Sequence, residues 1–491
     1  MNPPGFVRWR PGTRVIAAAL LVLGCVPAEA GPTHRFDVTV HDSLERIDVR
    51  GCFAGNAPNE LVAQTDGARF YLNSMRIGGR QLVPAGDKVS LGKVEDGACL
   101  EYRVTLQPAQ SRAQTGGPET RRVAGSMLTS IGEWLWRPSG NDAGLELRFH
   151  LPPGIEVSAP WPRLTASDAQ PVYRVGPSPS NWPGVVVFGN FARREIRIAG
   201  TVLQVALLDI PAPSQQAQLE TWIAKTAAHV ATLYGRFPVP ALQVVVAPTP
   251  GKGGPVPWAY VSRGGGPAVH LFVNAARPAR EFDRDWTLAH EMSHLFLPYI
   301  VSRDAWLFEG LPTYLQNVLM ARGGATSAEE AWLRMRTGFR RGARTAPNLS
   351  LAQANERYGI GGTYLRVYWA GAALMLAADL RLRSETGGQH SLDTALEQLS
   401  RCCASEQRRW SAQEIIARLD AVTGTTVFSD VTRDQFDAAG FPDYDALLAR
   451  AGVKIEGVRV QFDATAPWAR AREALMQPSG LAPQADGINP E

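Results

Sequence analysis

The spacing of apolar residues changes character part-way along the chain. Up to about residue 198, strand-like short runs occur at 36–40, 70–72, 100–106 and 145–149, with Gly, Pro and Asn clusters between them. Alternation with a period of two is typical of strands that bury one face. The pattern therefore predicts a β-rich N-terminal domain over residues 31–198, built as a β-sandwich.

Beyond residue 198 the pattern mixes strands with helices. Residues 201–208, 241–247 and 269–273 predict strands, and apolar positions at helical spacing predict an amphipathic helix over 215–234. Past Arg280, most segments have helical spacing, with Gly and Pro between them. We expect a multidomain α+β protein with a mixed domain over 199–345, a C-terminal helical domain over 346–476 and a disordered tail over 477–491.

The first 30 residues have the features of an export signal. Three arginines precede an apolar run over residues 15–26, and Ala28 and Ala30 supply the small residues that a signal peptidase reads. A run of about a dozen residues is too short to span a bilayer, which needs ~20. We expect cleavage after Ala30 and a periplasmic or secreted product with no stable membrane insertion. A lipoprotein anchored through Cys25 is the less favoured alternative, because Leu23 fits a lipobox poorly.

Composition and charge exclude some classes of function. The 491 residues are 45% hydrophobic and 20% charged, which is typical of globular proteins. The 50 basic and 46 acidic side chains give a formal charge of +4. So small an excess over a long chain does not indicate binding to nucleic acid or to an anionic membrane surface.

Four cysteines follow the predicted signal peptide: Cys52, Cys99, Cys402 and Cys403. An even number permits disulfides in an oxidising compartment. A bridge between the neighbours Cys402 and Cys403 would be strained, whereas Cys52 and Cys99 lie within one β-rich stretch. We expect a Cys52–Cys99 disulfide and leave the state of the other two cysteines open.

Candidate chemistry is concentrated at residues 290–309. His290, Glu291 and His294 form an H-E-x-x-H sequence. On a helix, residues four apart share a face, so His290 and His294 can both bind one metal ion. Glu291 lies between them, where it can act as general base on water bound to that ion.

A third metal ligand follows on the next predicted helix, where Glu309 lies in the first turns, 15 residues after His294. Catalytic zinc takes three protein ligands and leaves a position for water. His290, His294 and Glu309 meet that requirement. We therefore expect one Zn²⁺ per chain, held by these three side chains.

The sequence around Glu309 resembles a known family. Residues 306–314 are similar to the W-L-x-E-G-x-x-x-Y segment of gluzincin metallopeptidases, which include the aminopeptidase-N-like and glycyl aminopeptidase families. Residues 234–240 resemble a turn of the family's catalytic domain, and residues 368–371 resemble its Y-x-K-G segment, with Ala370 in place of Lys. The resemblance spans about residues 200–460. It implies a thermolysin-like zinc catalytic domain between the β-sandwich and a helical domain that closes the cleft.

The resemblance also implies roles for further residues. It assigns transition-state stabilisation to Tyr368, for which Tyr364, one helical turn earlier, is the rival. The stretch 262–274 has no acidic residue to match the Glu of the aminopeptidase-N-like G-x-M-E-N segment, which binds the substrate's free amino terminus. Glycines 264–266 either allow close approach of substrate or form a plain turn, and His270 is expected to be packed or exposed rather than part of the site.

Together these features predict an exported zinc peptidase that acts on peptide or protein substrates. Aminopeptidase and endopeptidase action both stay open. One alternative is a non-catalytic exported zinc-binding or assembly protein, although structural zinc usually has a fourth protein ligand and none is apparent here. A second alternative is a hydrolase that uses the same zinc site on an ester.

Overall fold

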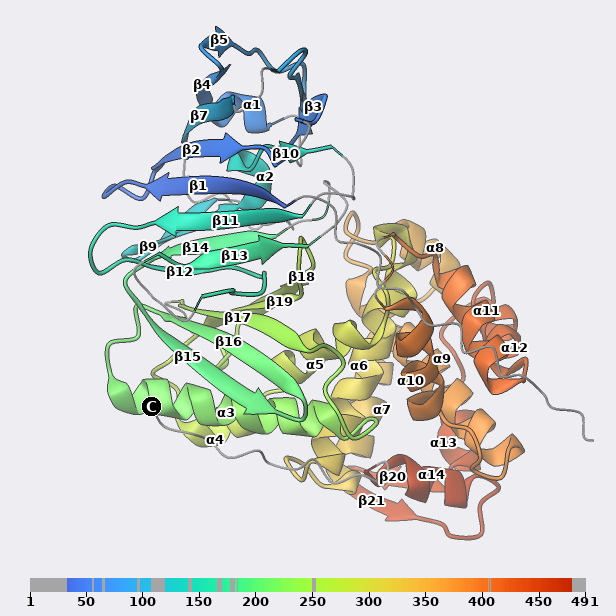
Figure 1. Ribbon diagram of the computed structural model, residues 1–491. Coiled ribbons are helices and arrows are strands. Elements are labelled where there is room, and N and C mark those ends of the chain that lie inside the picture. Colours follow the sequence, from blue (N-terminus) through green and yellow to red (C-terminus); the bar gives the residue numbers. More distant parts are fainter. Residues whose placement is uncertain are drawn as a thin grey trace, which may run out of the picture.

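The computed structural model describes residues 33–478, except for 55–56, 64–66, 95–97, 107–119, 140–143, 166–169, 177–181, 183, 250–252, 405 and 407. The predicted signal peptide, Cys25 and most of the predicted tail lie outside the described residues. A β-rich part formed by the N-terminal half is stacked on a second sheet, and helices pack on the opposite face of that sheet and beside it (Figure 1).

The N-terminal part is built from three sheets that share one core. A seven-stranded sheet has the order β13-β11-β1-β2-β7-β4-β5, and it is joined by a four-stranded sheet, β12-β14-β9-β8, and a three-stranded sheet, β10-β3-β6. The elements are β1 His34–Val40, β2 Arg46–Cys52, β3 Glu60–Val62, α1 Ala68–Tyr71, β4 Leu72–Ile77, β5 Arg80–Gln81, β6 Lys88–Ser90, β7 Cys99–Thr105, β8 Arg121–Val123, β9 Ser126–Ser130, α2 Ile131–Trp134, β10 Arg137–Pro138, β11 Leu145–His150, β12 Glu156–Ser158, β13 Val172–Val175 and β14 Val185–Gly189.

Strand β14, like the neighbouring strand β9, is buried on both faces. All five of its residues are buried. Val186 and Phe188 point into the core of the N-terminal sheets, whereas Val185 and Val187 pack against the next sheet. A strand between two layers needs apolar residues throughout, which explains the continuous apolar run.

The second sheet has five strands in the order β15-β16-β17-β19-β18. Its elements are β15 Phe191–Ile198, β16 Thr201–Leu208, β17 Ala241–Pro248, β18 Trp258–Ser262 and β19 Ala268–Val273, with helix α3 Pro213–Ala231 between β16 and β17. Strands β16, β17 and β19 are parallel, and the edge strands β15 and β18 pair antiparallel with their neighbours. Val205, Val244 and Leu271 on one face pack against the helices, and Ala206 and Val245 on the other pack against β14.

The second sheet starts earlier than the sequence pattern predicts. Strand β15 pairs with β16 along its whole length, from Phe191↔Leu208 to Ile198↔Thr201. The expected boundary after residue 198 therefore falls inside a hairpin, whose tight turn places Gly200 at φ +79°. The middle of β15 consists of polar, exposed residues, so the sequence pattern does not show that this strand belongs to the second sheet.

The C-terminal half is mainly helical and shares one core with the second sheet. Its elements are α4 Ala279–Asp283, α5 Thr287–Ser293, η1 His294–Phe296, η2 Ser302–Asp304, α6 Ala305–Arg322, α7 Ala328–Arg344, α8 Leu351–Glu356, α9 Tyr364–Glu385, α10 Leu392–Cys403, α11 Ala412–Thr423, α12 Val427–Gln435, α13 Tyr444–Arg450, β20 Val453–Glu456, β21 Arg459–Phe462 and α14 Ala469–Leu475. The hairpin β20–β21 was not predicted. The strand expected at residues 70–72 is wrong, because Phe70 and Tyr71 belong to helix α1 and only Leu72 belongs to a strand, β4.

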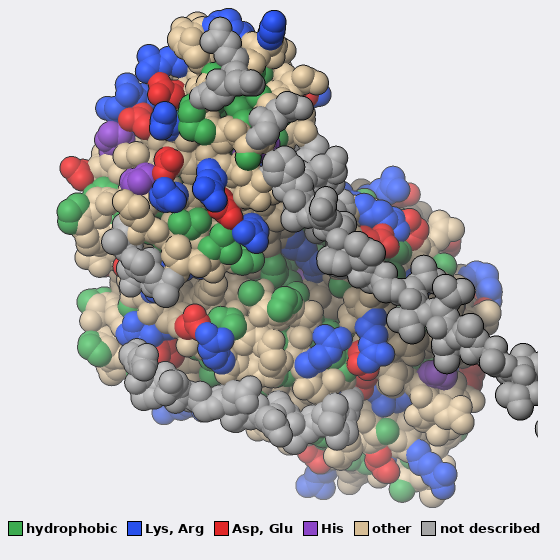
Figure 2. All heavy atoms as spheres, in the orientation of Figure 1, with side chains coloured by type: hydrophobic (Ala, Val, Ile, Leu, Met, Phe, Trp, Pro, Cys, Tyr) green, Lys and Arg blue, Asp and Glu red, His purple; other side chains and the backbone are tan. Residues whose placement is uncertain are grey.

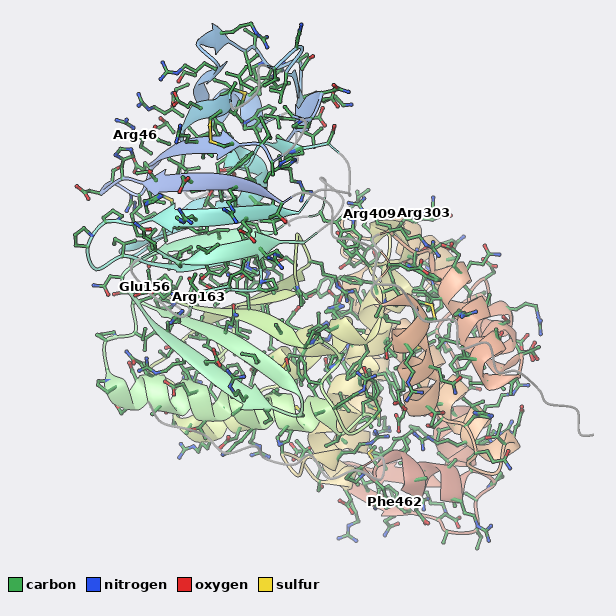
Figure 3. The ribbon with its side chains drawn as sticks, in the orientation of Figure 1. Arg46, Glu156, Arg163, Arg303, Arg409 and Phe462 are labelled. Carbon is green, nitrogen blue, oxygen red and sulfur yellow. A yellow bond between two sulfur atoms is a disulfide. The ribbon has the colours of Figure 1, made fainter. Side chains whose placement is uncertain are left out.

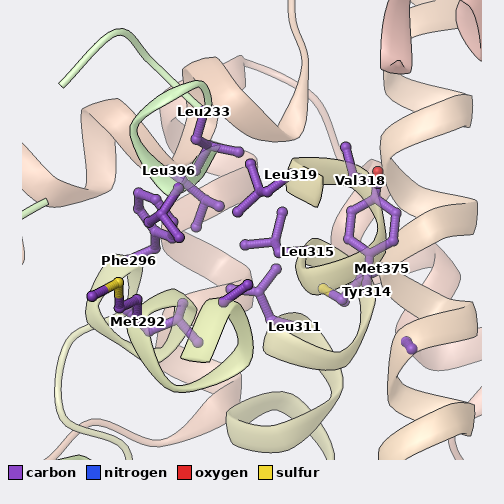
Figure 4. Packing of buried hydrophobic residues seen from close by; sticks show 14 of the residues in the cluster. Leu233, Met292, Phe296, Leu311, Tyr314, Leu315, Val318, Leu319, Met375 and Leu396 are labelled. Atoms are coloured by element: carbon purple, nitrogen blue, oxygen red, sulfur yellow. The ribbon is translucent and has the colours of Figure 1, made fainter. Parts of the chain in front are cut away.

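This shared core crosses the domain boundary expected at residue 345. One cluster of buried side chains runs from Ala199 to Leu475. Leu233, Phe296 and Leu396 come from three distant parts of the chain and lie side by side within it (Figure 4). The α/β part and the helical part therefore form one packed unit rather than two separate cores.

The structure contains two disulfides among the described residues. Cys52 and Cys99 face each other across β2 and β7 and are bonded, which is the pair that the sequence favours. Cys402 and Cys403 are also bonded, although a bridge between neighbours was expected to be strained. Helix α10 ends at Cys403, so this bridge lies at the last two residues of the helix.

Charged side chains lie mostly at the surface. Acidic and basic groups are interspersed over the face shown in Figure 2. Arg46, Glu156 and Arg303 lie at the periphery of the molecule (Figure 3). Within the described part of the chain, none of the helices combines the length and the apolar character that a membrane span requires.

Candidate metal centre

The two histidines and Glu291 lie on a fully buried segment formed by α5 and η1. Leu288, Ala289 and Met292 anchor this segment in the shared core. Trp286 directly precedes α5 and is 45% exposed. Its ring lies edge-on to His290 at 5.7 Å between centroids.

The three expected ligands converge on one point. Glu309, in the second turn of α6, places Oε2 at 3.3 Å from His290 Nε2 and 3.7 Å from His294 Nε2. The donor atoms of all three lie within 4.8 Å of one another. Zinc bonds of about 2.0–2.1 Å in a tetrahedron put ligand atoms roughly 3.3 Å apart. The described side chains are therefore spaced as zinc ligands.

A hydrogen bond sets which nitrogen of His290 faces this point. Nδ1 of His290 lies 2.8 Å from Oε1 of Gln316, an oxygen that can only accept. The ring proton therefore belongs on Nδ1, which leaves a lone pair on Nε2 directed at the Glu309 carboxylate. An imidazole nitrogen and a carboxylate oxygen directed at one buried point are ligand types that zinc takes, so this donor set fits a zinc ion. Gln316 is a site residue that the sequence did not reveal.

Burial controls the protonation of the site. It raises the pKa of Glu291 to about 7 and lowers that of His294 to about 3. Burial also acts to lower the pKa of His290, but contact with Glu309 outweighs it and raises the value. Oε2 of Glu291 lies 3.9 Å from His294 Nε2. A carboxylate beside the ligands with a pKa near neutrality is suited to accept a proton from water.

Two glycines bring α9 against α6. A Cβ at Gly310 would lie 2.6 Å from the Gly371 backbone, and one at Gly371 would collide with the Trp306 carbonyl oxygen. The helix that packs against Gly371 is therefore α6, which carries Glu309. The contact places Tyr368, one turn before Gly371, next to the metal ligands.

Tyr368 is the tyrosine of this helix that faces the centre. Its ring stacks on His290 with 5.9 Å between centroids and 4° between planes. The rival Tyr364 is 53% exposed and meets only the edge of the Tyr368 ring. The geometry therefore favours Tyr368 over Tyr364 for a role in the site.

A second tyrosine that the sequence did not single out also belongs to the site. The hydroxyl of Tyr358 donates to Oε1 of Glu309 at 3.2 Å and lies 3.3 Å from the Tyr368 hydroxyl. Tyr358 follows α8 in a glycine-rich stretch, and no helical spacing relates it to the ligands. Its proximity to Tyr368 along the chain was the only signal available.

The stretch 262–274 does not supply an acidic group to the site. Arg263 instead donates to the carbonyl oxygens of His294 at 2.5 Å and Leu297 at 2.8 Å, so it supports the end of the ligand-bearing segment. A Cβ atom at Gly265 would collide with Trp161, and one at Gly266 would collide with the Pro160 backbone. Gly265 and Gly266 therefore allow close packing against the N-terminal part, and not close approach of a substrate.

His270 is packed away from the centre, as the sequence favoured. It is fully buried, stacks on Tyr260 with centroids 4.5 Å apart, and lies 3.3 Å from the Ser262 hydroxyl. No ligand atom of the metal centre is among its partners.

The buried cluster of His290, His294 and Glu309 lies on an α+β architecture that is found in solved proteins. An aminopeptidase N family protein from Idiomarina loihiensis superposes with a TM-score of 0.66 at 14% identity, over 86% of this chain and 79% of that one. An M1 zinc metallopeptidase from Deinococcus radiodurans, with a Tyr-Ser-Ala substrate bound, gives 0.53 at 14% identity, over 82% and 92%. Yeast LTA4 hydrolase gives 0.53 at 11% identity, over 84% and 68%.

No family model and no curated protein matches the chain by sequence. At these identities the structural likeness establishes the fold. The chain thus has the fold of the M1 zinc metallopeptidases, and the resemblance to gluzincins is confirmed at that level. What the fold does in this protein depends on the residues of the centre itself.

Proposed function

We propose that the protein is an exported, zinc-dependent peptidase that hydrolyses peptide bonds with metal-activated water. The observation that carries the proposal is the convergence of His290, His294 and Glu309 with Glu291 beside them. Three ligands with a neighbouring carboxylate are what a hydrolytic zinc site requires. A bound zinc ion would polarise the scissile carbonyl and make its water acidic.

The protein's own residues would supply the remaining steps. Glu291 accepts a proton from the attacking water and passes it to the leaving amine. Tyr368 donates its hydroxyl hydrogen to the oxygen of the scissile carbonyl as negative charge develops there. Gln316 keeps His290 in the tautomer that presents Nε2.

Substrate preference is the finer part of the proposal. The Deinococcus relative has been solved with a tripeptide, so short peptides are the first substrates to test. The acidic residue that would bind a free amino terminus is absent from residues 262–274, which leaves cleavage within the chain open. Digestion of a peptide library by purified, zinc-loaded protein separates these cases. Stepwise trimming from the amino end supports an aminopeptidase, and internal cuts support an endopeptidase.

Glu291→Gln tests the mechanism. The amide keeps the size of the side chain but is not basic, so zinc content should stay near one per chain while hydrolysis falls by at least ~10²–10⁴. Metal analysis and peptide turnover on the same sample measure both quantities. Unchanged turnover in the zinc-loaded variant would eliminate this mechanism.

The competing proposal is a non-catalytic exported zinc-binding or assembly protein of the same fold. It predicts zinc binding without hydrolysis of any peptide or ester in the library. Export itself rests on the sequence of residues 1–30. Amino-terminal sequencing of the mature protein from a periplasmic fraction tests it, with Gly31 as the expected first residue.

A further inference from the structure

The two oxygens of Glu309 have different partners. Oε2 faces the imidazole nitrogens of His290 and His294. Oε1 accepts the hydrogen bond from Tyr358, and the Tyr368 hydroxyl also interacts with the Glu309 carboxylate. Because a phenol has one hydrogen, a Tyr358 hydroxyl that donates to Glu309 can meet Tyr368 only as an acceptor.

Hydrogen bonds of the residues before and after Tyr358 in the chain hold it in this position. On the amino-terminal side, its backbone amide donates to the carbonyl of Asn355, and the side chain of Asn355 bonds to the backbone of Arg303 and Trp306 at the start of α6. On the other side, the Thr363 hydroxyl lies within hydrogen-bond distance of the carbonyls of Ala354 and Arg357, which closes the loop.

The loop between these anchors turns Tyr358 inward and its other residues outward. Gly359 and Gly362 adopt φ of +82° and +67°, a region that disfavours residues with a Cβ. Ile360, between them, is 88% exposed. Within this segment, the Tyr358 hydroxyl is therefore directed at Glu309, which it contacts at 3.2 Å.

We propose that Tyr358 is a positioning residue that acts on two groups of the centre at once. Its O–H keeps Oε1 of Glu309 turned away, so that only Oε2 is directed at the metal position and a place for water is left open. Its oxygen accepts from Tyr368 and holds that hydroxyl beside the centre until a substrate oxygen takes its place. The second role rests on the proposed peptidase function, and the first does not.

The test is Tyr358→Phe in the full chain, with three measurements. Zinc affinity is measured by competition with a chelator, the visible spectrum is recorded after replacement of zinc by Co²⁺, and kcat and KM are measured on a peptide that the wild type cleaves. We expect zinc binding to be retained and the Co²⁺ spectrum to change, because Oε1 becomes free to turn toward the metal. We expect kcat to fall roughly 10–100-fold with KM little changed.

Tyr364→Phe is the matched control. It also removes one phenol hydroxyl beside Tyr368, but that hydroxyl belongs to an exposed ring in edge contact only. The control should leave the Co²⁺ spectrum unchanged. If Tyr358→Phe also leaves the spectrum unchanged, Tyr358 does not hold Glu309 and the first role is wrong, whatever the activity of the wild type.

A double-mutant cycle with Tyr368→Phe tests the second role. If Tyr358 acts through the Tyr368 hydroxyl, its removal should reduce kcat much less when that hydroxyl is already absent. Equal fold losses in both backgrounds would overturn the second role. A melting temperature close to that of the wild type identifies variants that are folded. Should Tyr358→Phe melt early, the cycle is run with Tyr358→Leu, which also lacks the hydroxyl.

Discussion

A neutral amide, rather than a carboxylate, orients the first histidine of the metal centre. Gln316 is buried, and its Oε1 is 2.8 Å from Nδ1 of His290. Partners of this kind fix the ring tautomer, and an anionic partner also makes the imidazole a stronger ligand. The metal affinity of this protein therefore depends on a side chain that never touches the ion.

Gln316→Leu should weaken zinc binding by about 10–100-fold, because the buried Nδ1–H loses its acceptor. Gln316→Glu should bind zinc at least as tightly as the wild type, since it replaces the amide by a charged acceptor of the same size. Competition with a chelator measures both variants. Equal affinity in all three proteins would show that Gln316 does not orient His290.

His270 should make folding sensitive to acid. Burial, with a smaller contribution from Arg121, lowers its pKa from 6.5 to about 3. The folded state therefore holds the neutral ring, whereas the unfolded chain takes up a proton below pH 6.5. The stability from this group is complete above pH 6.5 and falls by about 1.4 kcal/mol for each pH unit between there and about pH 3.

His270→Phe keeps a ring against Tyr260 but cannot titrate. Unfolding by denaturant at several pH values should show a flatter acid dependence for this variant than for the wild type between pH 6 and 4. Parallel curves would mean that His270 already carries its proton in the folded protein.

Residue spacing was sufficient to find part of the centre. His290, His294, Glu291 and Glu309 lie on two successive helical segments, so local periodicity places them together. Tyr358 and Gln316 could not be found in that way. Tyr358 reaches the centre from a loop, and Gln316 differs from other buried polar residues of α6 only by its partner on α5.

At the scale of elements, the crossing of α6 and α9 depends on Gly310 and Gly371. Gly371→Ala would press a methyl group onto the Trp306 carbonyl and force the helices apart. We expect a loss of about 1–3 kcal/mol in the free energy of unfolding, together with a displaced Tyr368 and reduced turnover. Thermal unfolding and peptide turnover measure the two effects.

Gly361→Ala is the control for that substitution. Gly361 has open space around its Cβ position and is not among the glycines with positive φ. The change should alter stability by less than about 0.5 kcal/mol. A comparable loss at Gly361 would show that the effect at Gly371 does not come from helix contact.

The elements themselves could be predicted to different degrees. The alternating runs that include β1, β7 and β11 and the long helix α3 were predicted because each has a strong period and one buried face. The hairpin β20–β21 was missed, since its two strands have four residues each and are largely exposed. Short exposed strands give no periodic signal.

At the scale of the whole molecule, the two disulfides should contribute unequally to stability. Cys52–Cys99 joins residues 47 apart, whereas Cys402–Cys403 joins neighbours. A cross-link stabilises mainly by restricting the unfolded chain, and a loop of that length corresponds to about 4 kcal/mol. Bridging neighbours restricts almost nothing.

Replacing both Cys52 and Cys99 by Ala should therefore lower the free energy of unfolding far more than replacing Cys402 and Cys403 by Ala. Denaturant unfolding of the two double variants, without reductant, compares them directly. Non-reducing peptide mapping of the wild type checks the pairing first. Free thiols at Cys52 and Cys99 would contradict the expected bridge.

Strand β14 also affects the order in which the molecule is assembled during synthesis. When residues 33–189 have emerged and packed, Val185, Val187 and Leu128 still present an apolar surface with nothing to cover it. The segment that covers it, β15 to β19, is the next to leave the ribosome. The second sheet thus covers the apolar surface that the first part of the chain leaves exposed. A chain interrupted near residue 190 would keep this apolar surface exposed to solvent, which favours aggregation.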